Sequence, residues 1–186
     1  MADTVLTRTQ AEDAIYSAVC ACLGLDESSA LAQRRVRRAW PSAEEQGAQP
    51  GFARTENVCF LRVSPADEPY SAFAETQSAY DAAADALRQT QSRCDALAVL
   101  LVFYGPAAFD DARRVRDGLT REEIRRVLRR KNLYPARPPA APRRVPELSG
   151  GRWWERCDLT LTLYERTERQ YMAGYIAQAD VTSKGD

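Results

Sequence analysis

The spacing of hydrophobic residues predicts a helix at the start of the chain. Apolar side chains recur every three or four positions over residues 9–23. The stretch Thr9-Gln10-Ala11-Glu12 at their beginning is typical of a capping box, with Thr9 as the N-cap. We expect this helix to end near Gly24, since glycine commonly ends helices.

Shorter patterns then predict strands. Residues 34–41 fit a short strand with Val36 and Trp40 on one face. Residues 57–63 alternate between two faces and fit a better strand. The remaining segments of this region, 42–51 and 64–67, are expected to form a loop and a turn.

The middle of the chain has one ambiguous segment and one clear strand. The alanines of residues 79–87 favour a helix by propensity, whereas residues 87–94 are more typical of an exposed strand. From Ala96 to Tyr104 the sequence is rich in leucine and valine without polar alternation. That composition predicts a central strand buried on both faces.

Two helices are expected after this strand. Pro106 suits a first helical position, and Gly118 suits a helix end. Residues 120–123, Thr-Arg-Glu-Glu, form a second capping-box pattern that begins the next helix. The side chains expected to face the core are Ala108, Ala112, Val115 and Leu119 in the first helix, and Ile124, Val127 and Leu128 in the second.

The last third of the chain predicts edge segments and a long strand. Residues 134–146 contain five prolines and fit an extended crossing or an edge segment. Residues 152–166 form the strongest strand pattern, and a short strand at 171–176 is expected before a polar tail. One face of the long strand should carry Trp153, Cys157, Leu159, Leu161 and Leu163.

Length and composition indicate one soluble domain. The chain has 186 residues, of which 28% are charged and 45% hydrophobic. We divide it into a helix at 9–23, a sheet with two helices over 34–166, and a short strand and tail over 167–186. No apolar run approaches the roughly 20 residues that span a bilayer. Residues 1–9 lack the build of a secretory signal, so we expect the protein to stay in the cytoplasm or join an assembly there.

The charge is zero overall but unevenly spread. Residues 1–110 contain 9 basic and 15 acidic residues, and residues 111–186 contain 17 and 11. This asymmetry suits subunits that meet head to tail, and it can also mark a nucleic-acid surface. The five cysteines, an odd number, argue against a disulfide framework. Without histidine they are expected to be buried thiols rather than metal ligands.

The turn at Tyr104-Gly105-Pro106 lies where α/β proteins often bind phosphate. A phosphate-binding loop needs several glycines whose N–H groups converge on the anion, and here a proline removes one donor. A Gly-x-Ser-x-Gly elbow is also missing from the sequence. We interpret the turn as structural.

Carboxylate pairs are the remaining candidates for acid–base chemistry. Asp110 with Asp111 and Glu122 with Glu123 lie at predicted helix starts, where the helix dipole favours acids. The helix dipole explains these acidic pairs without catalysis. We therefore expect that the protein is not an enzyme and binds no cofactor or metal.

Arginines cluster on the two predicted helices. Glu122 can pair with Arg125 or Arg126 one turn away. The cluster fits a solvated face, a contact with another subunit, or a nucleic-acid surface. A surface that binds single-stranded nucleic acid would need aromatic residues between the arginines, and this cluster lacks them. The candidate subunit-contact residues are Arg113, Arg116, Arg125, Arg126, Arg129 and Arg130.

Two motifs in order resemble the neck or tail terminator proteins of long-tailed bacteriophages. The first is Phe103-Tyr104-Gly105-Pro106, followed by Phe109 and by Ala112-Arg113. The second, about thirty residues after the first helix, is Gly151-Arg152-Trp153 with Glu155 and Arg156. That family often has a polar residue directly after Gly-Pro, where this chain has Ala107.

The resemblance implies an α+β fold, with helices packed on a mostly antiparallel sheet. It also implies that residues from about Arg88 are extended in a long hairpin or edge. The implied function is a structural ring, usually of six subunits, that ends the tail tube and joins it to the head-side connector. DNA would pass through the ring without specific binding, and no membrane or catalytic residue is implied. Part of the Arg113–Lys131 surface would contact a neighbouring subunit or ring.

Two alternatives stay open at this point. One is a head-closure or adaptor subunit of the same neck. The other is a nucleic-acid-binding accessory protein that uses the arginine-rich helix, whose binding would weaken steeply with salt.

Overall fold

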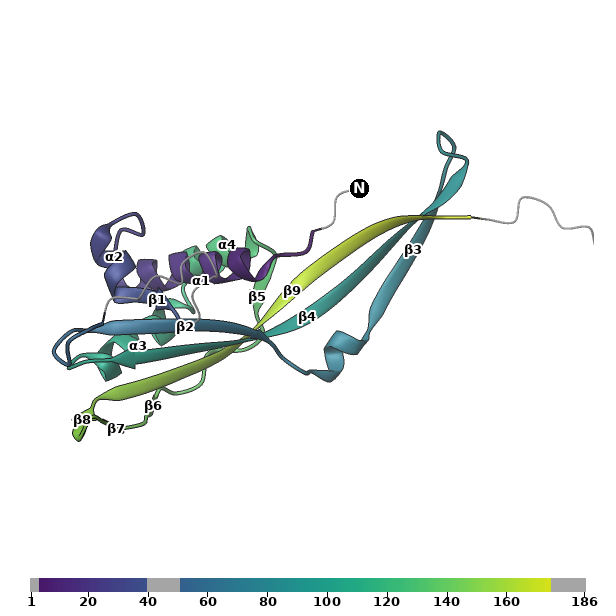
Figure 1. Cartoon of the computed structure of the whole chain (residues 1–186). Helices are drawn as coiled ribbons and strands as arrows, with labels where there is room; N and C mark the ends of the chain where they lie inside the picture. The colour runs from purple at the N-terminus through teal and green to yellow at the C-terminus, as the bar shows by residue number, and fades with distance from the viewer. Residues whose placement is uncertain (1–3, 40–50, 175–186) are drawn as a thin grey trace, which may run out of the picture.

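The fold is a mixed sheet with helices on one face (Figure 1). The computed structural model describes residues 4–39 and 51–174. The main sheet has seven strands, with the order β1-β2-β4-β9-β5, while β3 pairs with β4 and β6 pairs with β9. Only the β1–β2 pair is parallel. The expected α+β class with a mostly antiparallel sheet is therefore confirmed.

Two long strands form the spine of the molecule. β4 (Ala86–Tyr104) and β9 (Arg156–Ala173) pair antiparallel without a break, from Leu87 opposite Ala173 to Tyr104 opposite Arg156. The other edge of β4 is shared by β2 (Val58–Pro65) in one half and by β3 (Ala74–Asp81) in the other. β4 therefore has a different neighbouring strand on this edge in each half of its length.

Helices cover only one half of this spine. α1 (Arg8–Leu23), α3 (Ala108–Gly118) and α4 (Glu122–Arg129) enclose the main core against the sheet. The core side chains come from both layers and include Val19, Leu61, Leu101, Phe103, Val115, Leu128 and Leu159. The other half of the spine, together with β3, projects beyond the helices as a three-stranded arm (Figure 1).

The arm resolves the ambiguous segment in favour of the extended conformation. The alanine-rich residues 79–87, which favour a helix by propensity, contribute to β3, the turn after it and the start of β4. Pairing with β4 supplies β3 with a hydrogen-bonded neighbour, and this context outweighs a weak intrinsic preference. The hairpin that the family resemblance implied is confirmed.

The helix starts differ from their predicted positions. The N-cap of α1 is Thr7, two residues before Thr9, and its capping box uses Gln10 in place of Glu12. The helix does end at Gly24, as predicted. α3 begins at Ala108, so Pro106 precedes it by two residues. The N-cap of α4 is Arg121, without a side-chain cap, because the Thr120 hydroxyl donates to the Asp117 carbonyl instead.

The predicted inward faces of these helices are mostly right. The four residues expected to be buried in and after α3 are buried, and so are Ile124 and Leu128 in α4. The prediction that Val127 is buried is wrong, because this residue is 37% exposed. Gly118 is the last residue of α3, as predicted, and it also lies directly against α1.

The early strands are shorter or longer than predicted. The segment 34–41 begins as the end of a short helix, α2 (Ala30–Arg35), and only β1 (Val36–Arg38) is a strand. β2 continues through Pro65, so the turn expected at 64–67 is wrong in its first half. A 3₁₀ helix, η2 (Pro69–Ala72), then leads into β3. Trp40 and the loop predicted for 42–51 lie outside the described residues, except Gly51.

The proline-rich segment forms sheet edges, as predicted. β5 (Leu133–Pro135) and β6 (Arg143–Arg144) both pair with β9. The strand predicted for 152–166 is divided at Glu155 into β8 (Arg152–Trp154), which pairs with β7 (Glu147–Ser149), and β9. Trp153 is therefore not part of the buried face and is 63% exposed. The short strand expected at 171–176 is the end of β9 up to Ala173, and residues 175 and 176 are not described.

Burial separates the two faces of the central strand. On β4, Val99, Leu101 and Phe103 are fully buried under the helices, whereas the alternate residues are only half-buried. The expectation of burial on both faces is thus wrong for the second face. All five cysteines are free thiols, and four of them are buried, while Cys94 is half-buried. Within the described ranges, no helix is long and apolar enough to cross a membrane.

Candidate functional site

The Tyr104-Gly105-Pro106 turn is held by its neighbours in a conformation that requires glycine. Gly105 has a φ of +104°, which side-chain-bearing residues rarely adopt. A Cβ at this position would lie 2.3 Å from the Glu56 carbonyl oxygen. The Gly105 N–H donates to the Glu155 carbonyl at 3.2 Å, and the Ala107 N–H donates to Asn57 Oδ1 at 2.9 Å. The turn is therefore occupied by the protein's own groups.

The second motif contacts this turn, so the two resemblance motifs form one site. Tyr104 and Arg156 are opposite each other in the β4–β9 pairing. The Tyr104 hydroxyl donates to Glu147 Oε2 at 2.7 Å, and Arg156 Nη1 donates to the same oxygen at 3.1 Å. Arg156 also donates hydrogen bonds to both carboxylate oxygens of Asp158, at 2.8 and 2.9 Å. Bidentate pairing of this kind fixes the guanidinium plane.

Hydrogen bonds and burial shift the pKa values of this network. The hydrogen bond from Tyr104 lowers the pKa of Glu147, and the bond from Arg156 adds to this effect. Burial acts in the opposite direction but does not cancel it. Burial, together with the bond to Glu147, raises the pKa of Tyr104 to about 12. The bonds to Asp158 raise the pKa of Arg156. At neutral pH the site thus contains a neutral phenol between charged partners, an arrangement that holds strands together.

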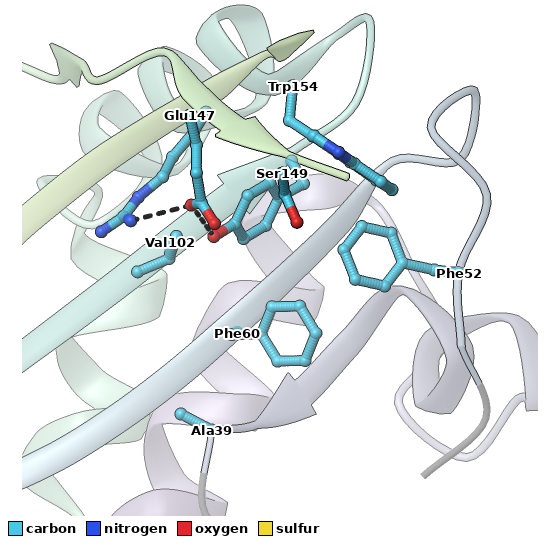
Figure 2. A pocket seen from close by; sticks show the side chains of 9 residues that line it. Ala39, Phe52, Phe60, Val102, Glu147, Ser149 and Trp154 are labelled. Carbon is cyan, nitrogen blue, oxygen red and sulfur yellow. Dashed lines mark hydrogen bonds and ion pairs between the residues drawn. The ribbon is translucent and has the colours of Figure 1, made fainter. Parts of the chain in front are cut away.

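Beside this network is a pocket of about 400 Å³ with aromatic walls (Figure 2). Phe52, Phe60, Tyr104 and Trp154 supply the rings, with neighbouring centroids 5.4 to 6.4 Å apart. Since Phe60 and Tyr104 alternate with core residues of β2 and β4, the pocket lies on the sheet face opposite the helices. Trp154 Nε1 is buried without a hydrogen-bond partner among the described residues. The rings mainly bring β2, β4 and β8 together.

The side chains of the other motif residues take no part in this network. Gly151 lies in the turn between β7 and β8, and Trp153 points to solvent. Pro106 leads from the turn into α3. Glu155 contributes its backbone carbonyl to Gly105, while its side chain lies 3.4 Å from Arg144.

The carboxylate pairs do not form a catalytic arrangement. Asp110 is exposed, whereas Asp111 is buried and lies 2.5 Å from Arg35 Nη2 on α2. Burial raises the pKa of Asp111, although Arg35 opposes that effect. Glu122 pairs with Arg129 at 2.6 Å rather than with Arg125 or Arg126, so that prediction is wrong. Across 4–39 and 51–174, no cluster of three or more His, Cys, Asp or Glu side chains could hold a metal ion.

The structure divides the six candidate contact arginines into two groups. Arg116 donates to the Pro139 carbonyl at 3.3 Å, Arg129 pairs with Glu122, and Arg113 stacks on Phe109 at 5.8 Å. The other three, Arg125, Arg126 and Arg130, are exposed and make no ion pair within the described part of the chain. Only this second group is available to a partner without breaking a contact.

Several residues of the site were not identified from the sequence. Glu147 is the common partner of Tyr104 and Arg156, and Asn57 accepts from the backbone after Pro106. Neither carries a local pattern, because both act over long separations in sequence. Phe52 and Trp154 had a signal, as large aromatic residues, but nothing in the sequence showed that they meet.

Fold and site together describe an α+β protein with a projecting three-stranded arm and a strand-to-helix turn that is held by hydrogen bonds within the chain. The profile of a family described as phage neck terminator protein matches residues 10–186. The chain belongs to the phage neck terminator protein family, a structural family of the virion neck, and the resemblance seen in the two motifs is confirmed. Among curated proteins, no sequence matches this chain.

Proposed function

We propose that the chain forms a closed homo-oligomeric ring that ends the tail tube and joins it to the head-side connector. The observation that carries this proposal, beside the family, is the arm. Residues 74–80 of β3 are exposed, and the paired stretch of β4 contains no fully buried side chain before Ala96. A sheet exposed on both faces gains little from hydrophobic burial in a single chain.

The edge of the arm supports the same proposal. β3 pairs with β4 over eight successive residues without a bulge, and it contains no proline or lysine. Exposed edge strands in soluble proteins usually carry such features, which prevent pairing with other chains. An edge without a proline, a lysine or a bulge is consistent with a strand that a partner covers in the assembled neck.

The proposed work of the ring is mechanical and requires no catalysis. Its partners would be further copies of the chain, the tail tube protein and the connector, with DNA passing through the centre. Assembly would take place in the host cytoplasm, as expected from the sequence.

Production of phage without a functional copy of this chain tests the proposal. We expect filled heads and separate tails that fail to join, and restored joining when the chain is supplied in trans. Normal yields of complete virions without the chain would contradict the proposal. A strongly salt-sensitive affinity of the purified chain for DNA would favour the nucleic-acid alternative instead.

A further inference from the structure

An acidic and aromatic surface lies at the base of the arm. Residues 66–87 contain five acidic residues and no basic residue. Tyr70 and Phe73 are 68% and 73% exposed, and their ring centroids are 6.3 Å apart. We call the surface formed by Asp67, Glu68, Tyr70, Phe73 and Glu75 the acidic patch. None of its three carboxylates forms an ion pair with a described residue.

Two arginines beside this patch interact with other acidic residues. Arg93 and Arg166 line the hollow beside Phe73 and Glu75. Arg93 donates to the Ser71 carbonyl and lies 3.6 Å from Asp95, while Arg166 lies 3.0 Å from Glu168. Each already has an acidic neighbour of its own.

A basic surface lies on α4. Arg125, Arg126, Arg130 and Lys131 are exposed, and none forms an ion pair with a described residue. Val127 lies on the same side of α4 as Arg130, one turn away, and is 37% exposed, although the helical pattern predicted it to be buried. We call these five residues the basic face. It combines positive charge with one exposed apolar side chain.

The two surfaces lie on opposite sides of the sheet. Tyr70 packs against Tyr164 at 6.5 Å, and Tyr164 stands between Leu163 and Glu165, which are buried on the helix side. Alternation along β9 therefore places Tyr164 and the acidic patch on the face without helices. α4 lies in the helix layer, against α1 (Figure 1). The surfaces cannot meet within one chain.

We propose that the basic face of one copy docks on the acidic patch of the next copy around the ring. Arginine binds carboxylates and stacks on aromatic rings, and both partners are present in the patch. Tyrosine, phenylalanine and arginine are also enriched at the centres of protein interfaces. A contact between two different surfaces is heterologous, and its repetition closes a ring when the rotation allows it. This inference rests on the proposed ring.

Charge reversal on each surface tests the contact. One variant carries Arg126→Glu and Arg130→Glu, and a second carries Asp67→Arg and Glu75→Arg. The control is Arg62→Glu, an exposed arginine of β2 outside both surfaces. Native mass spectrometry and sedimentation of the purified full chain over a concentration series measure assembly, and thermal unfolding verifies that each variant folds.

We expect each reversed variant to need at least a tenfold higher concentration for half-assembly, and the control to match the unaltered chain. An equimolar mixture of the two variants should assemble again, because every contact in an alternating ring then pairs opposite charges. The chain with all four substitutions should assemble for the same reason. A second pair, Tyr70→Ala with Phe73→Ala, should weaken assembly without changing any charge.

Failure of this contact and failure of the ring can be distinguished. If the unaltered chain forms rings that the reversals leave intact, the contact is wrong and the ring stands. If folded variants lose assembly but their mixture does not recover it, the pairing of these two surfaces is also wrong. An unaltered chain that stays monomeric at every concentration, with or without purified tail tubes, contradicts both.

Discussion

A Cβ atom on Gly118 would lie 2.5 Å from the Sγ of Cys22, so α1 and α3 meet with no room for a side chain at this point. The thiol fills the space that the glycine leaves. Burial raises the pKa of the Cys22 thiol to about 11, which keeps it protonated and unreactive at neutral pH. This cysteine is a packing residue.

Substitution Gly118→Ala should destabilise the protein in spite of the better helix propensity of alanine. Alanine gains up to about 1 kcal/mol in a helix interior, and less at its last residue. Overpacking typically costs about 1–3 kcal/mol. We expect a net loss of about 1–2 kcal/mol in the free energy of unfolding, measured by urea denaturation. Gly51→Ala is the control, because apart from its chain neighbours no atom of the described residues lies within 4 Å of a Cβ there. Equal stabilities of the two variants would contradict this packing.

Substitution Tyr104→Phe should remove one charge-assisted hydrogen bond and cost about 1–2 kcal/mol at pH 7. Its effect should depend on pH through Glu147, whose pKa in the folded protein lies below the ordinary value of 4.5. A lowered pKa contributes stability above pH 4.5 that is lost as pH falls through the folded value. The difference between the two proteins in unfolding free energy should therefore shrink below pH 4.5. A difference that is constant from pH 7 to pH 3 would contradict the role of Glu147.

Arg35 and Asp111 should be strongly coupled. Removing Arg35 leaves a buried carboxylate whose remaining basic neighbour, among the described residues, is Arg114 at 3.7 Å. We expect Arg35→Ala to cost about 2–3 kcal/mol, less than for a fully buried pair. Asp111→Asn with Arg35→Ala should cost clearly less than the sum of the single changes, by about 1 kcal/mol or more. Additive effects in a double-mutant cycle would show that the pair is not coupled.

Amide hydrogens of the arm should exchange with solvent faster than those of the core in the free chain. Residues 87–92 of β4 have little apolar packing, whereas residues 99–103 of the same strand lie under the helices. Local opening is easier where few apolar contacts hold the strands. Exchange measured by mass spectrometry should slow in the arm, and not in the core segment, when the ring forms. Equal protection in both states would remove the arm from the interface.

The sequence predicted those elements whose pattern is local. The helix ending at Gly24 and the alternation of 57–63 follow from hydrophobic periodicity, which reports one element at a time. The apolar run up to Tyr104 predicted a strand correctly, although only one of its faces is fully buried. The arm was harder to predict from the sequence. Ala79 and Leu87 have helical or neutral propensity, and only long-range pairing makes them extended. The family resemblance supplied what propensity could not.

The site shows even more clearly that local sequence patterns do not reveal contacts between distant residues. Tyr104, Gly105 and Arg156 were identified from motifs, but their common partner Glu147 was not. A single glutamate in a loop-like segment has no pattern, and its role comes from the fold that brings β7 beside β4. Helix starts were also misplaced by one or two residues. Thr7 caps α1 where Thr9 was predicted, and Arg121 is the N-cap of α4 where Thr120 was predicted.

Cryo-electron microscopy of the intact virion neck would show directly whether this chain forms the ring. We predict a closed ring of this chain between the last ring of the tail tube and the head-side connector, with the arms in contact between subunits. A virion neck in which this chain is absent, or present only as isolated copies without mutual contact, would contradict it.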